Sequence, residues 1–276
     1  MSLFVSGLRK LARRRASWVT LGLLAGLLSL IVIAVGATSN RPGASAAERA
    51  AILSLVTFPG AYDQILTFIL GLGGLFAVIY GAAIAGSEWT WGTLKNAVAR
   101  GQSRSRYTLL TFASVAAAIA VGLVVTFVVG VVAALVGANL AGVSTSGLTD
   151  TATIGRLPGQ FARGWLAIVE EGALGFTIAT LARSQLAGIG VGIGAYFAEG
   201  IAQVFVPDVI KWFPFAASSA VVARTSSAGG GGGGGGFSGG LGNSLDPNTA
   251  VIVVIAWLVV ALAVASAWTE RAEISG

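Results

Sequence analysis

Residues 16–37 read ASWVTLGLLAGLLSLIVIAVGA and contain no charged side chain. A helix of this length, at about 1.5 Å per residue, crosses the roughly 30 Å of hydrocarbon in a bilayer. A secretory signal peptide is the competing interpretation, because residues 44–46 read Ala-Ser-Ala, like a cleavage site. The run, however, is longer than the roughly 7–15 residues of a signal core. We therefore expect a retained first span, preceded by five basic residues: Arg9, Lys10, Arg13, Arg14 and Arg15.

Five further apolar runs are also long enough to cross a bilayer. They are residues 63–86, which follow a Pro59-Gly60 break, and residues 107–137, 161–182, 185–206 and 250–268. The run at 107–137 is too long for a perpendicular span, so it is tilted or projects beyond the lipid. Abundant Gly and Ala are typical of closely packed membrane helices. The pattern predicts an all-α integral membrane protein with six transmembrane helices, forming a single domain over residues 1–276.

The composition excludes several classes of protein. The chain is 55% hydrophobic and 10% charged, whereas soluble domains carry roughly 25% charged residues. It has no Cys and no His, which excludes Ser-His-Asp and Cys-His nucleophiles, His-ligated metals and disulfides. The net charge of +6 comes from basic residues at the ends of apolar runs, so we assign it to membrane orientation and expect no nucleic-acid partner.

The distribution of Lys and Arg predicts the orientation. With an even number of spans both termini lie on one side, which carries eleven basic residues against six on the other. The positive-inside rule then places both termini in the cytoplasm. We expect a multi-pass protein of the cell membrane, in a bacterium the inner membrane.

Two segments outside the spans stand out. In residues 1–15, Phe4, Leu8 and Leu11 fall at helical spacing. They predict an amphipathic helix with its basic residues (Arg9, Lys10, Arg13 and Arg14) turned away from the apolar face. A plain basic tail is the alternative. The second segment is the run of glycines at 229–236, within an extracytoplasmic loop at 207–249. No Lys-Ser/Thr follows the run, so it is a flexible linker and not a phosphate-binding loop.

The loop between the second and third runs, residues 87–105, has the most specific sequence. Residues 87–104 read SEWTWGTLKNAVARGQSR. Ser87 can cap a helix, and Glu88 in its first turn suits the helix dipole. Trp89 and Trp91 are natural anchors at headgroup level. With an apolar face continuing after them, the stretch predicts a short helix at the inner surface of the membrane.

This loop resembles the permease subunits of the second class of ABC exporters, which includes drug, polysaccharide and lipid export permeases. Gly101 stands where that family often has Pro, and Thr111 where it commonly has Lys. A second stretch, from Leu174-Gly175-Phe176 to Ala182-Arg183-Ser184, looks like the family's turn between the fourth and fifth spans. The resemblance covers nearly the whole topology, although its specific motif is only about eighteen residues long. The matching residues are Glu88, Gly92, Thr93, Leu94, Arg100, Ser103 and Arg104.

The resemblance implies a non-catalytic transport subunit, whose cytoplasmic coupling helix docks on a separate ABC ATPase and receives its motion. It also implies a second permease copy, as a homodimer or a related heterodimer, and short outer helices around Trp212 and Phe213. No Gly-x-x-x-x-Gly-Lys-Ser/Thr motif occurs in the chain, so ATP and Mg belong to the partner ATPase and we expect no cofactor on this chain. A loop whose charges only set orientation is the alternative. The coupling residues implied are Glu88, Trp89, Trp91, Gly92, Thr93, Leu94, Lys95, Arg100 and Arg104.

Three acidic residues fall inside predicted spans: Glu170, Glu171 and Glu199. A charge at the bilayer centre costs roughly 2.5–3.5 kcal/mol on insertion scales, so these groups are candidates for a polar cavity or a gate. Glu170 and Glu171 could instead be protonated, paired with a basic residue such as Arg163, or nearer the surface. In a self-contained secondary transporter or channel, all three would couple ions to transport, but such proteins usually show an internal repeat, and none is evident. An aspartyl intramembrane enzyme is disfavoured, since every Asp lies at a span end or in a loop. The sequence does not identify the substrate.

Overall fold

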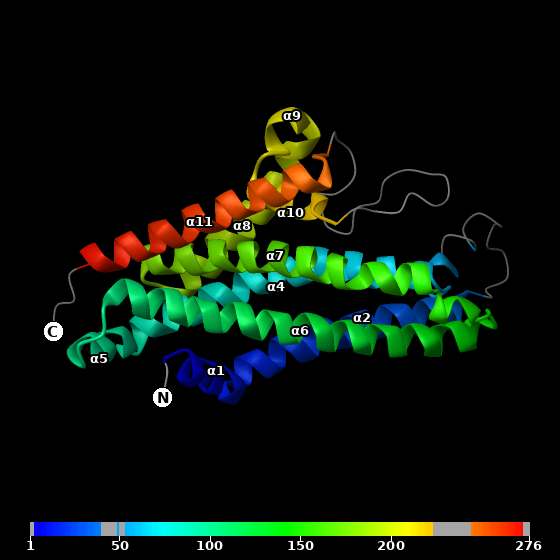
Figure 1. Cartoon of the computed structure of the whole chain (residues 1–276), viewed down its shortest axis with the longest axis horizontal. Coiled ribbons are helices and arrows are strands. Elements are labelled where there is room, and N and C mark those ends of the chain that lie inside the picture. The colour runs from blue at the N-terminus through cyan, green and yellow to red at the C-terminus, as the bar shows by residue number, and fades with distance from the viewer. Residues whose placement is uncertain (1–2, 40–48, 50–52, 223–243, 273–276) are drawn as a thin grey trace.

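The computed structural model describes residues 3–39, 49, 53–222 and 244–272. Over these residues the chain is helical, with no β-strand. The glycine run at 229–236 lies outside the described residues. The helices labelled in Figure 1 are α1 Leu3–Arg13, α2 Arg15–Thr38, α4 Gly60–Thr90, α5 Thr93–Ala99, α6 Arg104–Ala141, α7 Thr151–Ala182, α8 Gln185–Phe205, α9 Pro207–Ile210, α10 Pro214–Ala220 and α11 Pro247–Arg271.

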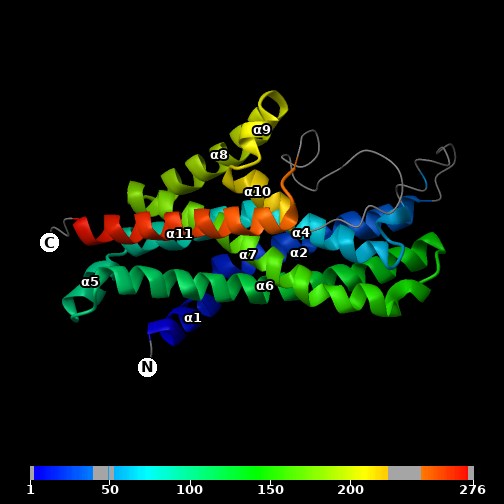
Figure 2. The ribbon, with the colours of Figure 1, turned by 45° about the horizontal axis from the view of Figure 1, so that its top comes forward.

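Six of these helices (α2, α4, α6, α7, α8 and α11) are long and apolar enough to cross a membrane. This confirms the predicted all-α architecture with six candidate spans, as in a multi-pass membrane protein. The helices run along the long axis of the molecule, and both termini lie at the same end as α5 (Figure 1). Short outer helices were also expected, and α10 packs against α7, α8 and α11 (Figure 2).

Five of the six candidate spans extend beyond the apolar runs from which they were predicted, whereas α8 matches its run to within one residue. The largest difference is at α7, which begins ten residues before the expected start at Phe161. Its cap is Asp150, whose carboxylate accepts a hydrogen bond from the Thr153 backbone N–H at 2.9 Å. Hydrogen bonds from Thr153 also lower the pKa of Asp150. The first turns of α7 are polar, so hydropathy alone does not detect them, whereas the cap starts the helix.

The closest packing in the bundle is between α4 and α7. A Cβ atom on Gly81 would lie 2.1 Å from the Gly172 carbonyl oxygen, and one on Gly175 would lie 2.1 Å from the carbonyl oxygen of Val78. Neither backbone has room for a methyl group. Where lipid supplies no hydrophobic drive between helices, such close approach maximises van der Waals contact. Glycine at these positions therefore sets the separation of the two helices.

Two aromatic clusters extend the core to either side of this contact. Tyr62 stacks on Phe127, with ring centroids 6.0 Å apart, and Phe161 meets Phe127 edge-on at 4.7 Å. In the second cluster, Phe112 of α6 meets Phe176 of α7 edge-on, with ring centroids 5.4 Å apart. Edge-on pairs of this kind contribute about 0.5–1.5 kcal/mol beyond their buried area. Aromatic contacts therefore add to the packing of the bundle at two places along α6.

We expect Gly81→Ala to lower the stability of the folded chain by about 1–3 kcal/mol, because the added methyl group overpacks the α4–α7 contact. The matched control is Gly159→Ala on α7, where a Cβ atom meets nothing within 4 Å. That change should be neutral or slightly stabilising, since Ala favours a helix over Gly. Thermal unfolding of both variants in detergent micelles measures the difference. Equal unfolding temperatures for the two variants would contradict the packing described here.

Candidate functional site

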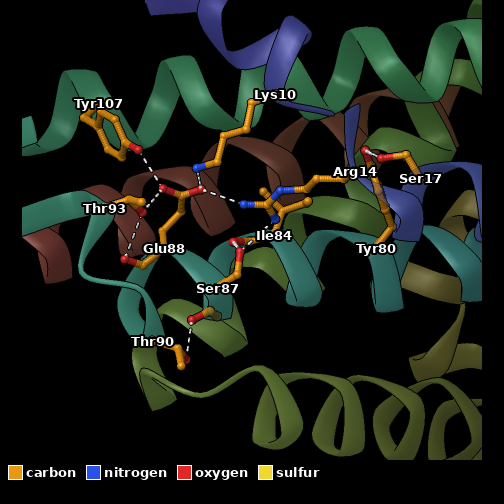
Figure 3. Close-up of polar contacts among 11 residues, drawn as sticks. Lys10, Arg14, Ser17, Tyr80, Ile84, Ser87, Glu88, Thr90, Thr93 and Tyr107 are labelled. Carbon is orange, nitrogen blue, oxygen red and sulfur yellow. Dashed lines mark hydrogen bonds and ion pairs between the residues drawn. The ribbon is translucent and has the colours of Figure 1, made fainter. Parts of the chain in front are cut away.

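Glu88 is the centre of a polar cluster at the end of the bundle that carries both termini (Figure 3). The side chain lies in the last turn of α4 and is buried. One carboxylate oxygen, Oε1, accepts a hydrogen bond from Lys10 and lies 3.5 Å from Arg14 Nη2. The other, Oε2, accepts hydrogen bonds from the hydroxyls of Thr93 and Tyr107, the latter at 2.6 Å. We call these five residues the Glu88 node.

The members of the Glu88 node come from different elements. Lys10 belongs to α1 and Arg14 to the α1–α2 junction, while Thr93 opens α5 and Tyr107 lies in the first turn of α6. A buried carboxylate is costly unless cations and hydrogen-bond donors satisfy it. Two cations and two hydroxyls meet this need for Glu88. The burial of one charge therefore holds α1, α4, α5 and α6 together.

The structure corrects the expected role of Ser87 and Glu88. The sequence predicts that Ser87 caps a short surface helix with Glu88 in its first turn, but both residues belong to the last turn of α4. The Ser87 hydroxyl donates to the carbonyl oxygen of Ile84 at 2.8 Å and accepts from Arg14 Nη1 at 2.8 Å. Because the α1 segment neutralises Glu88, α4 continues beyond its apolar run. It ends only near Gly92, whose φ of 64° lies in the left-handed region that favours glycine.

Two basic residues of this segment have a partner that the sequence did not predict. Lys10 and Arg14 were expected to turn away from the apolar face of the helix, and both reach Glu88. Arg9 and Arg13 are exposed, as predicted. The other side of α1 packs closely on α6, where a Cβ atom on Gly7 would lie 2.3 Å from Ser114 Oγ. α1 therefore packs against the bundle. Lys10 and Arg14 reach the buried Glu88, whereas Arg9 and Arg13 are exposed.

Sequence reasoning did not identify Lys10, Arg14 and Tyr107 as members of the site. Lys10 and Arg14 are four residues apart, a spacing that puts them on one face of a helix. That spacing was a usable signal for a shared partner. Their partner, however, lies 78 residues from Lys10 along the chain, and only the fold reveals it. Tyr107 was read simply as the start of a span.

The other predicted coupling residues lie on or near α5. Leu94 is buried and anchors the helix, whereas Arg100 is exposed, as is Asn96, which was not in the predicted set. Trp91 is 63% exposed, and its ring lies 4.9 Å from the guanidinium carbon of Arg14. Trp89 has a similar partner in Arg183, at 5.1 Å. Such cation–π contacts are worth about 0.5–1 kcal/mol at exposed sites, so they help to hold the loop. Lys95 is also exposed.

Arg104 contacts a different helix from the one that carries Glu88. Its Nη1 donates to the carbonyl oxygens of Glu270 at 3.1 Å and Ala272 at 2.6 Å. Carbonyl groups at the C-terminal end of a helix such as α11 have no hydrogen-bond partner within the helix, and a cation there is also favoured by the helix dipole. Arg104 therefore ties the start of α6 to the end of the last span. Of the predicted coupling residues, Glu88 and Thr93 thus belong to the Glu88 node, whereas Arg104 belongs to a separate contact with α11.

The three carboxyl groups within candidate spans, Glu170, Glu171 and Glu199, are buried in the bundle, and two of them contact α10. Glu170 is fully buried and accepts a hydrogen bond from the Ser218 hydroxyl at 3.1 Å. Glu199 accepts from the backbone N–H of Ala216 at 2.5 Å. Glu171 lies against α4, where a Cβ atom on Gly74 would come within 1.7 Å of its Oε2. The glycine at position 74 makes room for this carboxylate.

The suggested pairing of Arg163 with Glu170 or Glu171 is wrong. Arg163 donates instead to Asn248 Oδ1 at 2.7 Å and to the Val221 carbonyl oxygen at 3.4 Å. Within the described residues, no Lys or Arg lies within ion-pair distance of Glu170, Glu171 or Glu199. Oε1 of Glu170 and Oε2 of Glu171 have no hydrogen-bond partner there either. These carboxylates therefore form a buried polar region without a basic partner.

The described residues contain no group of three or more His, Cys, Asp or Glu side chains arranged to hold a metal ion. Comparison with known proteins gives no match to a protein-family model and none to a curated protein. The function of the chain must therefore be inferred from its residues and from the geometry of the two polar sites.

We expect Glu88→Ala to loosen α1. Removing the carboxylate leaves Lys10 and Arg14 together without a counter-charge, at a cost of about 1–3 kcal/mol, because Lys10 is partly exposed and solvent reduces the roughly 3–5 kcal/mol of a fully buried pair. Amide hydrogen exchange in α1 should then be about tenfold faster or more. The control is Glu270→Ala, which removes an exposed carboxylate at the same end of the bundle. Unchanged exchange in Glu88→Ala would show that the node does not hold α1.

Proposed function

We propose that this chain is the membrane-spanning subunit of an ATP-driven exporter of the ABC type. It would form the translocation path and couple that path to a separate ATPase subunit. The observation that carries the proposal is the Glu88 node. Through it, a short helix with an exposed face is joined to α1, α4 and α6 at the end of the bundle where both termini lie.

The exposed face of α5 has the chemistry of a docking surface. Leu94 points into the bundle, while Asn96 and Arg100 are exposed and Trp91 flanks the helix. Aromatic and Arg side chains are enriched at the centres of protein interfaces. A partner with an acidic cleft would complement these residues. Sequence resemblance and exposed chemistry thus support the same partner class, an ABC ATPase.

Short connections make α5 suitable for transmitting a displacement. Only Trp91 and Gly92 separate α4 from α5, and residues 100–103 separate α5 from α6. Movement of α5 would pull on Thr93 and therefore on the buried carboxylate of Glu88. Through Tyr107 and Arg104 the same movement would reach α6 and α11. The link is built from discrete polar contacts, which can break or form as a unit.

The remaining parts of the proposal follow from sequence. The basic residues favour cytoplasmic termini, so α5 would face the compartment that supplies ATP. The chain has no nucleotide-binding motif of the Gly-x-x-x-x-Gly-Lys-Ser/Thr type, so the partner would bind ATP and Mg and this chain would be non-catalytic. A second copy of the chain, or a related permease, would complete the path across the inner membrane of a bacterium.

A separate observation supports a second candidate function. Glu170, Glu171 and Glu199 are buried inside candidate spans, and no basic side chain of the described residues pairs with them. Intramembrane carboxylates of this kind often mark ion or proton pathways. A secondary transporter or channel would use them to couple ion flow to transport and would need no ATPase.

The test is purification of the chain expressed together with its native gene neighbours. We expect a stoichiometric partner that hydrolyses ATP, and ATP-dependent transport when the complex is placed in liposomes. Glu88→Ala and Arg104→Glu should insert normally but lose most coupled transport, whereas Arg271→Glu, an exposed cation at the same end, should not.

Full transport by both the Glu88 and Arg104 variants would refute the coupling role. Solute or ion flux by the isolated chain in liposomes without ATP would instead support the secondary transporter.

A further inference from the structure

A cavity of about 440 Å³ lies between α1, α2, α4, α6 and α7. Its volume is within the range of pockets that hold small ligands. Among the residues that the structure describes, no charged side chain lines it, and its walls are mainly aliphatic and aromatic. The hydroxyls of Ser17 and Tyr80 form a hydrogen bond with each other at 2.9 Å, so each already has a polar partner. An apolar cavity of this kind does not favour water, so an apolar ligand suits it better.

The length of the cavity matches one leaflet of a bilayer. Tyr80 and Ile69 both line it, and on α4 they are separated by a rise of about 16 Å at 1.5 Å per residue. Half of the hydrocarbon core of a membrane is about 15 Å thick. Val121 and Trp18, also in the wall, are 63% and 64% exposed, so the cavity opens on the outside of the bundle. In a membrane that side faces lipid.

Basic residues flank the stretch of α1 that lines the cavity. Leu8, Leu11 and Ala12 of α1 line the cavity. Of the five cations between residues 9 and 15, Lys10 and Arg14 bind Glu88. Arg9, Arg13 and Arg15 are exposed, and within the described part of the chain no carboxylate pairs with them. An anionic phosphate at headgroup depth would complement these three arginines.

We propose that this cavity is a binding site for an anionic phospholipid of the surrounding leaflet, with one acyl chain between α2, α4 and α6 and the phosphate against Arg9, Arg13 and Arg15. The acyl chain would pack on Leu8 and Leu11 and hold α1 against the bundle. Since α1 supplies Lys10, the bound lipid would also favour the intact Glu88 node. Binding requires no ATPase, so its test is independent of the proposed function.

The experiment uses the full chain in nanodiscs with equal amounts of phosphatidylglycerol and phosphatidylcholine, followed by native mass spectrometry in mild detergent. We expect one retained phospholipid per chain, with phosphatidylglycerol favoured by at least about fivefold. Gly122→Leu should abolish retention by filling the cavity, because a Cβ atom there meets only Leu21, at 3.9 Å. Gly26→Leu on α2, which does not line the cavity and where a Cβ meets nothing within 4 Å, is the matched control and should retain the lipid.

The charge contribution is tested separately by replacing Arg9, Arg13 and Arg15 with Gln. This variant should retain a phospholipid but lose the preference for phosphatidylglycerol. The proposal is overturned if the wild type retains no phospholipid, if it retains an apolar compound of another class in its place, or if Gly122→Leu binds as the wild type does. Unchanged headgroup preference in the arginine variant overturns the assignment of the phosphate.

Discussion

The close contact between α4 and α7 is the constraint on which the rest of the structure depends. Glycines on both helices let the backbones approach to a distance that a single methyl group would prevent. This contact fixes the position of α4, whose last turn carries Glu88. It also sets Gly74 opposite Glu171, so the intramembrane carboxylate fits against the same helix. Both polar regions are therefore positioned by the packing of small residues.

Electrostatics then organises one end of the bundle. The chain buries a carboxylate at Glu88 and satisfies it with cations from the N-terminal segment and hydroxyls from the next two helices. A second contact, from Arg104 to the end of α11, adds the last span. Four of the six candidate spans, α2, α4, α6 and α11, thus meet at or beside polar contacts next to α5. This concentration of contacts around a helix with an exposed face supports a role in receiving motion from a partner.

Hydropathy predicted the six spans because predominantly apolar runs of this length have few stable environments other than lipid. It did not predict where the helices end, since caps and neutralised charges decide that: Asp150 starts α7 early, and the burial of Glu88 lengthens α4. Glu88 and its partner Thr93 could be chosen from sequence, but Lys10, Arg14 and Tyr107 could not, because they meet Glu88 only in the fold. The pairing of Arg163 with Glu170 or Glu171, one of the alternatives offered, is wrong for the same reason. Local spacing shows which side chains share a helix face, as for Lys10 and Arg14, but not which group on another helix they meet.

The measurement that tests the central claim most directly is site-specific cross-linking from α5. The chain contains no cysteine, so Asn96→Cys places a single thiol on the exposed face of this helix. Ser144→Cys, exposed in the connection between α6 and α7 at the other end of α6, is the matched control. Each variant is co-expressed with the native gene neighbours, treated with a short bifunctional cross-linker, and the products are identified by mass spectrometry. We predict that position 96, and not position 144, cross-links to a protein bearing a nucleotide-binding motif. A transport-active preparation in which position 96 forms no such product would contradict the account.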